Sequence, residues 1–214
     1  MELFHYCVRI GVTGHRTLDN ELELKKQIYK VLNTKIPALF ENGLFTQRKR
    51  NTPELFNYTV LTSLAEGADR LVAETVIEYN SLSDIEIVMP LTLFDYKKTF
   101  KNPDDPLFIN LFNKATSVKQ LRKKNLESGS KNIKDLDELS IENNFDKALN
   151  KAFENAGRHV VNNCDVLIAL WDGEKPRGIG GTCEIIEYAM SEERPIIIIS
   201  TNPPYKINIM NPMK

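Results

Sequence analysis

Five short runs of apolar, mostly β-branched residues punctuate the chain and are typical of β-strands. They lie around residues 6–12, 58–63, 85–89, 165–171 and 195–199. Within the last two, residues 166–170 and 196–199 are apolar throughout rather than alternating. Continuous apolar runs are expected when helices cover both faces of a parallel sheet. We therefore predict that all five strands are parallel members of one sheet.

Between these runs, apolar positions recur at spacings of three and four, which predicts amphipathic helices. Asn20 and Glu23 precede the first of these stripes at the spacing of a capping box. The alternation of strands and helices predicts one doubly wound, Rossmann-like α/β domain over residues 1–200, with about five or more strands. The helical stripes cover residues 24–32, 68–79, 145–160 and 185–190.

Two segments break this rhythm. In an excursion over residues 94–142, we expect a short helix over 107–118, and the mixed charges of 119–138 are typical of a solvated surface loop. The alternative is a lid, because the excursion precedes the strand at 165–171 and can fold over the edge of the sheet. The tail, residues 201–214, contains three prolines and no periodicity. It is interpreted as an ordered arm, a linker or an oligomer contact.

Glycines, charges and hydroxyls follow three of the predicted strands. The strand at 165–171 leads into a glycine-rich turn at 177–184, which opens a helix and exposes backbone N–H groups to an anion. Thr182 is expected to cap this helix. Because the carboxyl ends of parallel strands share one edge, we predict a single ligand pocket there. The candidate ligand-binding residues are Thr13, Gly14, His15, Arg16, Glu66, Gly67, Asp69, Asp172, Gly178, Gly180, Gly181 and Thr182.

The side chains in these loops suit different parts of a ligand. Arg16 supplies a planar fork for phosphate or carboxylate. His15 is interpreted either as a hydrogen-bonding or stacking residue or as a catalyst. Glu66 and Asp69 do not favour phosphate by charge, so they suit ribose hydroxyls or a base edge. For Asp69 the alternative is a helix cap, with Arg70 in a surface ion pair.

Composition narrows the classes of partner. The formal net charge of −1 gives no global argument for nucleic acid or an anionic membrane. Cys7, Cys164 and Cys183 are too widely spaced for a metal knuckle, and their odd number argues against a disulfide framework. No signal-peptide pattern opens the chain, and no apolar run approaches the roughly 20 residues of a membrane-spanning helix. We expect a cytoplasmic protein with no metal, no cofactor and no membrane partner.

Three segments together resemble the SLOG superfamily: Gly-Val-Thr-Gly-His-Arg at 11–16, Ser-Leu-Ala-Glu-Gly-Ala-Asp-Arg at 63–70, and Ala-Gly-Arg-His-Val-Val-Asn-Asn-Cys-Asp at 156–165. That group includes the Lonely Guy phosphoribohydrolases, the DNA-processing Smf proteins and nucleotide-sensing domains of bacterial antiviral systems. The resemblance covers about residues 6–200. It implies a Rossmann-like sheet that binds a nucleotide or nucleotide derivative at the loops described above.

The chain departs from the Lonely Guy pattern, which has a Pro-Gly-Gly-x-Gly-Thr-x-x-Glu motif and a catalytic arginine on the preceding helix. The closing Gly-Thr and a following glutamate, Glu184, are present, whereas the Pro-Gly-Gly opening is not. Arg158 lies on the expected preceding helix. If the protein were a phosphoribohydrolase, Glu184 would be its catalytic carboxylate and Arg158 its catalytic arginine.

Our first hypothesis is a sensor that binds a nucleotide-derived signal, such as an ADP-ribose-type or cyclic nucleotide, in a bacterial antiviral system. The alternative is an N-glycosidase that releases a base from a nucleoside monophosphate. A DNA-binding, Smf-like protein ranks third. The expected partners are therefore a nucleotide-derived small molecule and further copies of the chain in a homo-oligomer, without nucleic acid. A DNA-binding surface would depend on Lys119, Arg122, Lys123 and Lys124.

Overall fold

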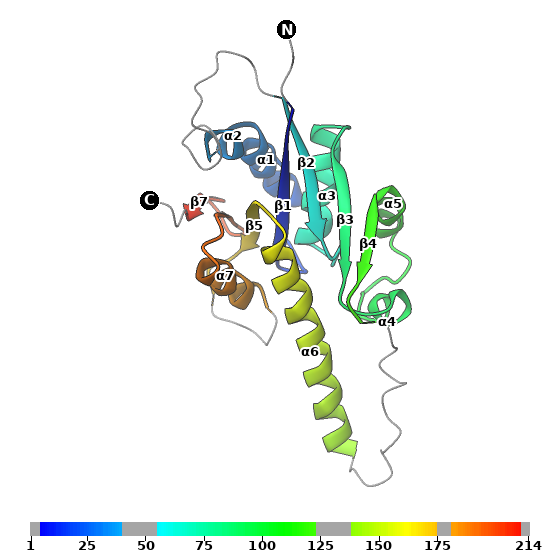
Figure 1. Ribbon diagram of the computed structural model, residues 1–214. Coiled ribbons are helices and arrows are strands. Elements are labelled where there is room, and N and C mark those ends of the chain that lie inside the picture. Colours follow the sequence, from blue (N-terminus) through cyan, green and yellow to red (C-terminus); the bar gives the residue numbers. More distant parts are fainter. Residues whose placement is uncertain (1–4, 40–54, 123–137, 175–180, 211–214) are drawn as a thin grey trace.

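A seven-stranded sheet forms the centre of the protein, with the strand order β4-β3-β2-β1-β5-β6-β7 (Figure 1). The computed structural model describes residues 5–39, 55–122, 138–174 and 181–210. Neighbouring strands from β4 to β6 are parallel, and β7 pairs with β6 in the antiparallel direction. The strands are β1 (His5–Gly14), β2 (Leu55–Thr62), β3 (Asp84–Met89), β4 (Ser117–Gln120), β5 (Val166–Trp171), β6 (Ile196–Ser200) and β7 (Ile207–Met210).

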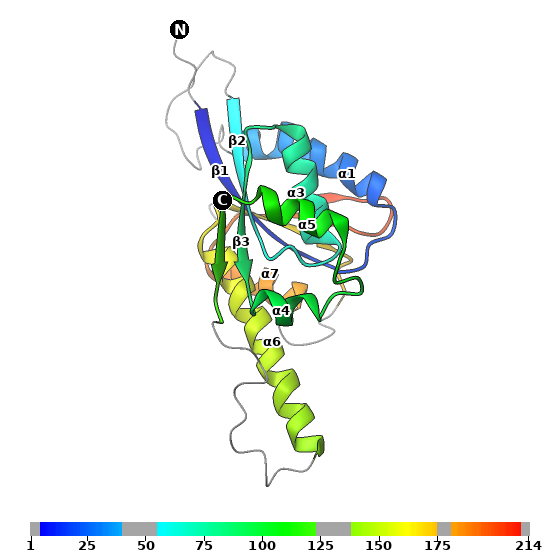
Figure 2. The ribbon, with the colours of Figure 1, turned by 90° about the vertical axis from the view of Figure 1, so that its right-hand side faces the viewer.

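Helices cover both faces of this sheet (Figures 1 and 2). One face packs against α1, α3 and α5, and the other against α6 and α7. The protein therefore has a doubly wound, Rossmann-like α/β fold. No helix in the described ranges combines the length and apolar character needed to cross a membrane. The helices are α1 (Glu21–Lys30), α2 (Ile36–Leu39), α3 (Ala68–Tyr79), α4 (Leu93–Lys97), α5 (Pro106–Lys114), α6 (Glu138–Asn162) and α7 (Thr182–Ser191), and a π-helical turn, η1 (Val31–Lys35), joins α1 to α2.

The five predicted strands are confirmed as β1, β2, β3, β5 and β6, and they are mutually parallel. Within the excursion at 94–142 the structure has α4, α5 and the edge strand β4, and α5 is the short helix expected there. The solvated loop expected over 119–138 was wrong for residues 119 and 120, which belong to β4. Its part at 123–137, with Lys123 and Lys124, lies outside the described residues. The helix expected over 107–118 ends earlier, at Lys114. In the tail, β7 extends the sheet, as expected of an ordered arm.

Two predicted helix caps were wrong. Asn20 has the left-handed φ of 55°, and its side-chain amide donates a hydrogen bond of 2.8 Å to the hydroxyl of Tyr205 instead of capping α1. Its capping-box partner, Glu23, accepts hydrogen bonds from Lys26 and Gln27. At α7, Gly181 occupies the N-cap position without a side-chain bond, and Thr182 is already the first helical residue.

A proline in the helical run from α1 to α2 is compensated by a tyrosine from β2. In the π-helical turn, the N–H of Ile36 bonds to the carbonyl oxygen of Val31, five residues earlier. The same register would join the next residue, Pro37, to Leu32, but proline has no N–H. The hydroxyl of Tyr58 donates to the Leu32 carbonyl oxygen at 2.9 Å instead. This buried tyrosine therefore replaces the missing helical hydrogen bond.

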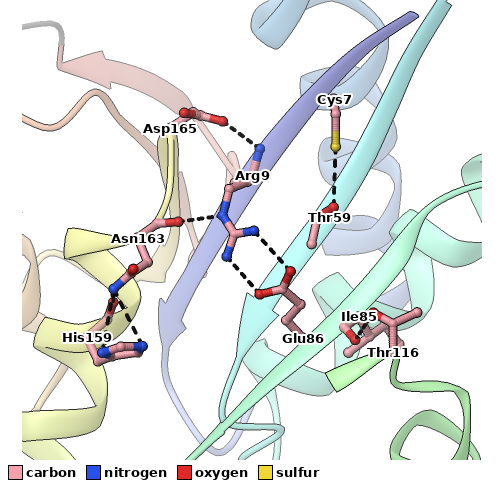
Figure 3. A network of polar contacts seen from close by, with 9 residues as sticks. All are labelled: Cys7, Arg9, Thr59, Ile85, Glu86, Thr116, His159, Asn163 and Asp165. Carbon is pink, nitrogen blue, oxygen red and sulfur yellow. Dashed lines mark hydrogen bonds and ion pairs between the residues drawn. The ribbon is translucent and has the colours of Figure 1, made fainter. Parts of the chain in front are cut away.

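A polar network joins β1, β3 and the carboxyl end of α6 (Figure 3). The guanidinium of Arg9 makes two hydrogen bonds to Glu86, of 3.0 and 2.8 Å, and its Nε donates to the carbonyl oxygen of Asn163 at 2.7 Å. The backbone N–H of Arg9 donates to Asp165 at 2.8 Å. Hydrogen bonding to Glu86 raises the pKa of Arg9. The network fixes the end of α6 against the sheet, away from the loops that follow β1 and β2.

The turn after β2 lies against the turn after β1 at a glycine. Gly67 has a φ of 77°, and a Cβ atom there would overlap the carbonyl oxygen of His15 and the backbone of Arg16. The next residue, Ala68, donates its N–H to the same His15 oxygen at 3.0 Å. A side chain at position 67 would therefore push the two turns apart.

We predict that Gly67→Ala destabilises the protein more than Gly173→Ala. Gly173 also has a positive φ, of 84°, but a Cβ there meets nothing within 4 Å. Its replacement should cost only backbone strain, about 1–2 kcal/mol, whereas Gly67→Ala adds steric overlap of roughly 1–3 kcal/mol. Chemical denaturation measures both losses. Equal losses would contradict a constraining contact between the two turns.

Candidate functional site

A cavity of about 300 Å³ opens at the carboxyl ends of β1, β2 and β5. At β1 the order of the strands reverses, because β2, β3 and β4 lie on one side of it and β5 and β6 on the other. Loops that leave neighbouring strands at such a point diverge toward opposite faces and leave a crevice. Its volume is at the lower end of the range of about 300–1,000 Å³ for small-molecule sites. The cavity therefore occupies the place where doubly wound sheets bind ligands.

The structure brings most of the predicted ligand-binding residues to this cavity. Glu66, Gly67 and Asp172 are not among its lining residues. Gly178 and Gly180 lie outside the described residues. The predicted residues that line the cavity are Thr13, Gly14, His15, Arg16, Asp69, Gly181 and Thr182.

Two contacts join the side chain of His15 to Asp172. Its Nε2 atom lies 3.0 Å from Oδ1 of Asp172 and 3.2 Å from the backbone nitrogen of the same residue. The ion pair requires a proton on Nε2, whereas acceptance of the backbone N–H requires a bare nitrogen. The two contacts therefore exclude each other, and which one forms depends on whether Nε2 carries a proton. Asp172 acts on the cavity through His15, which lines it.

Arg16 lies on the cavity wall between two other elements. One guanidinium nitrogen donates to the carbonyl oxygen of Thr99 at 3.3 Å. The guanidinium carbon lies 4.9 Å from the ring centroid of Phe153, which projects from α6. The planar group is therefore oriented by stacking and by one hydrogen bond, which leaves other N–H groups for an anion.

Asp69, in the first turn of α3, is a buried carboxylate on the cavity floor. Its Oδ2 atom accepts hydrogen bonds from the Thr62 hydroxyl at 2.8 Å and from the N–H groups of Ser63 and Ala65 at 3.1 and 3.3 Å. Burial raises the pKa of Asp69, against the opposing effect of these hydrogen bonds and of the Arg16 charge. Hydrogen bonds to this one carboxylate oxygen thus stabilise the turn after β2.

The other two predicted residues in this turn support it rather than line the cavity. Oε1 of Glu66 accepts the backbone N–H groups of Lys101 and Asn102, at 2.8 and 3.4 Å. Gly67 provides the contact with the turn after β1. Arg70 is buried, bonds to Asp105 and the carbonyl oxygen of Leu64, and is not the surface ion pair considered from the sequence.

The start of α7 forms the wall opposite β2. Gly181, at its N-cap, has a φ of −78° and a ψ of 171°, which any residue adopts. The backbone conformation therefore does not require glycine at this position. Thr182 and Cys183 follow in the first turn, whose backbone N–H groups have no partners within the helix. Such a helix start favours a negatively charged group.

Sequence reasoning missed the aromatic walls of the cavity, formed by Tyr96, Phe153 and Trp171. Trp171 ends a predicted strand and Phe153 lies in a predicted helical stripe, so neither was singled out as a ligand contact. Tyr96 lies in the excursion over 94–142, where no element was predicted at its position. The remaining signal was Gly157, in the motif at 156–165, where a Cβ would overlap Ile185. This glycine lets α6 approach α7 at the cavity.

The two candidate catalytic residues lie elsewhere. Arg158 and Glu184 line a separate hollow between α6 and α7, together with Glu154 and Tyr188. Arg158 bonds to Glu154 at 2.8 Å, and its guanidinium lies 4.4 Å from the ring centroid of Tyr188. Neither Arg158 nor Glu184 lines the cavity at the sheet edge.

We predict that stability depends on pH through Asp69. Burial raises its pKa in the folded protein above the value of about 3.9 in an unfolded chain. The resulting stability is complete below the unfolded pKa and is lost as the pH rises through the folded pKa. Asp69→Asn keeps an acceptor oxygen but does not titrate.

The free energy of unfolding of the wild type, relative to Asp69→Asn at the same pH, should therefore fall from about pH 4 toward neutral pH. Urea denaturation at matched pH values measures this difference. As a control, Asp69→Ala removes the acceptor and should cost about 1–3 kcal/mol. A constant difference between the wild type and Asp69→Asn would contradict the prediction.

Comparison with known proteins leaves the function to be argued from the cavity itself. No protein-family model matches the sequence, and a search among curated proteins finds no match either. The resemblance to the SLOG superfamily therefore rests on the motifs at residues 11–16, 63–70 and 156–165 and on the glycine turn that follows.

Proposed function

We propose that this protein binds a nucleotide-derived ligand in the cavity at the carboxyl ends of β1, β2 and β5, and acts as a sensor. The observation that carries the proposal is the composition of this cavity. Arg16 and the start of α7 suit an anionic group, Asp69 suits hydroxyls, and aromatic side chains form the apolar walls. A phosphorylated ribose that carries a base has these three kinds of surface.

The opposed charges give the ligand a direction. The Asp69 carboxylate repels a phosphate, so the anionic end of the ligand belongs with Arg16 and the first turn of α7. The neutral sugar then lies toward Asp69, and the base packs against Phe153 or Trp171. An ADP-ribose-type or cyclic nucleotide has this chemistry. The motifs that resemble the SLOG superfamily support such a signal, and with it a role in bacterial antiviral defence and a homo-oligomeric state.

The placement of Glu184 and Arg158 favours a sensor over an N-glycosidase. Glycosidic cleavage needs a carboxylate at the scissile bond, to stabilise the developing positive charge or to activate water. Both residues line the separate hollow between α6 and α7. Arg158 is already paired with Glu154 there.

We predict that Arg16→Lys weakens nucleotide binding, whereas Arg158→Lys does not. Both arginines stack on an aromatic ring, but only Arg16 lines the cavity. Lysine keeps the charge and loses the planar fork, which should cost about 1–3 kcal/mol of binding free energy. Calorimetry with ADP-ribose, cyclic AMP and AMP measures the effect. Equal losses in both variants, or no binding of any nucleotide, would contradict the proposed site.

We also predict that the purified protein releases neither adenine nor ribose 5-phosphate from AMP during long incubation. Glu184→Gln should bind nucleotide with an affinity close to that of the wild type, because this residue does not line the cavity. A carboxylate in the first turn of α7 favours the helix start by about 0.3–1 kcal/mol, which changes stability and not the ligand site. Chromatography of the reaction mixture measures release. Base release that disappears in Glu184→Gln would instead establish the N-glycosidase.

A further inference from the structure

Tyr96 is a buried tyrosine whose hydroxyl has no hydrogen-bond partner among the described residues. The residue is 1% exposed, and its ring is held edge-on to Phe100 at a centroid distance of 4.8 Å and near Phe153 at 6.2 Å. None of the described residues forms a hydrogen bond with its hydroxyl oxygen, which is nevertheless not sealed inside the protein. Since Tyr96 lines the cavity, the cavity is the space into which this hydroxyl opens.

A second buried tyrosine shows what is unusual about Tyr96. Tyr58 is also 1% exposed, but its hydroxyl donates to the carbonyl oxygen of Leu32. Buried polar groups are normally paired, because an unpaired group loses its hydrogen bonds to water without replacement. The hydroxyl of Tyr58 serves the fold, whereas that of Tyr96 is available to a ligand.

The carboxylate of Asp69 presents a complementary atom to the same cavity. All three hydrogen bonds described above go to Oδ2, and no described residue donates to Oδ1. Burial, and to a lesser degree the negative charge of Asp69, raises the pKa of the Tyr96 phenol. Tyr96 therefore keeps its proton and can both donate and accept. The same cavity is thus lined by an anionic acceptor and by a neutral hydroxyl.

We propose that Asp69 Oδ1 and the Tyr96 hydroxyl bind the two adjacent hydroxyls of a ribose ring and select ribonucleotides over deoxyribonucleotides. The inference rests on the proposed function, because it assigns one part of the same ligand. Of the two ligand types proposed, it fits the ADP-ribose type, since a 3′,5′-cyclic nucleotide has no free 3′ hydroxyl. A carboxylate oxygen accepts one sugar hydroxyl, and the phenol exchanges a hydrogen bond with its neighbour. A ligand that lacks either hydroxyl leaves a buried polar group unpaired, which is a strong basis for rejection.

The test is calorimetric titration with AMP, GMP, CMP and UMP and with their 2′-deoxy and 3′-deoxy counterparts. For each nucleotide that binds, we expect removal of either hydroxyl to weaken binding by about 10- to 100-fold. Tyr96→Phe should weaken binding of the ribonucleotide and abolish the preference for one hydroxyl, the one that the phenol binds, while the preference for the hydroxyl that Asp69 binds remains. Because the lost hydroxyl has no partner among the described residues, this variant should unfold at a temperature no lower than the wild type without ligand.

Tyr58→Phe is the matched control. It removes a buried hydroxyl that serves the fold, so it should lower the unfolding temperature and leave the preference for ribose unchanged. Equal affinity for ribonucleotides and deoxynucleotides, an undiminished preference for both hydroxyls in Tyr96→Phe, or the same loss of preference in Tyr58→Phe would each overturn the inference while leaving nucleotide binding established. Absence of binding by all of these nucleotides would overturn this inference, and absence of binding by ADP-ribose and cyclic AMP as well would overturn the proposed function.

Discussion

The contact between two backbone turns positions the whole cavity. Gly67 lies against the backbone of His15 and Arg16 with no room for a Cβ atom, and Ala68 donates a hydrogen bond to His15. Because neither contact involves a flexible side chain, the turns after β1 and β2 behave as one rigid unit. Arg16 and Asp69 both belong to this unit, so the contact sets the separation of their backbones. A site that depends on the relative position of a cation and a carboxylate needs such a support.

The burial of the Asp69 carboxylate at the cavity is unfavourable for the free energy of folding. Burial disfavours its charged form, and three hydrogen bonds to Oδ2 offset only part of that effect. An apolar residue would remove the charge penalty but would leave the hydroxyl of Thr62 and the N–H groups of Ser63 and Ala65 without their acceptor. The carboxylate is therefore both a structural acceptor and a charged group on the cavity floor. Unfavourable burial of this kind is common at functional sites.

The sequence was sufficient for the parallel sheet because two of its inner strands, β5 and β6, are apolar on both faces and the five predicted strands alternate with amphipathic helices. The sequence did not predict β4, whose four residues are all exposed. It did not predict β7 either, because no local pattern indicates that this segment pairs with β6. At the cavity, glycines and charged side chains that follow predicted strands were recognisable. Tyr96 was not recognisable. It lies in the excursion over 94–142, and the sequence there gives no sign that its hydroxyl lacks a partner among the described residues. Local spacing also predicted a capping role for Asn20, whose side chain instead bonds to Tyr205, in a distant part of the chain.

Because α6 is long, it connects the cavity to a point well beyond the carboxyl ends of the strands. Its last turns, with Ala156, Gly157 and Val160, form part of the cavity wall and pack on the sheet and α7. Its first half projects well beyond the carboxyl ends of the strands (Figures 1 and 2). The 14 residues from 138 to 151 span about 21 Å. A tilt of about 5° at the cavity would move the first turn by about 2 Å. A small tilt of α6 at the ligand site is thus enlarged at the amino-terminal end of the helix, beyond the strands.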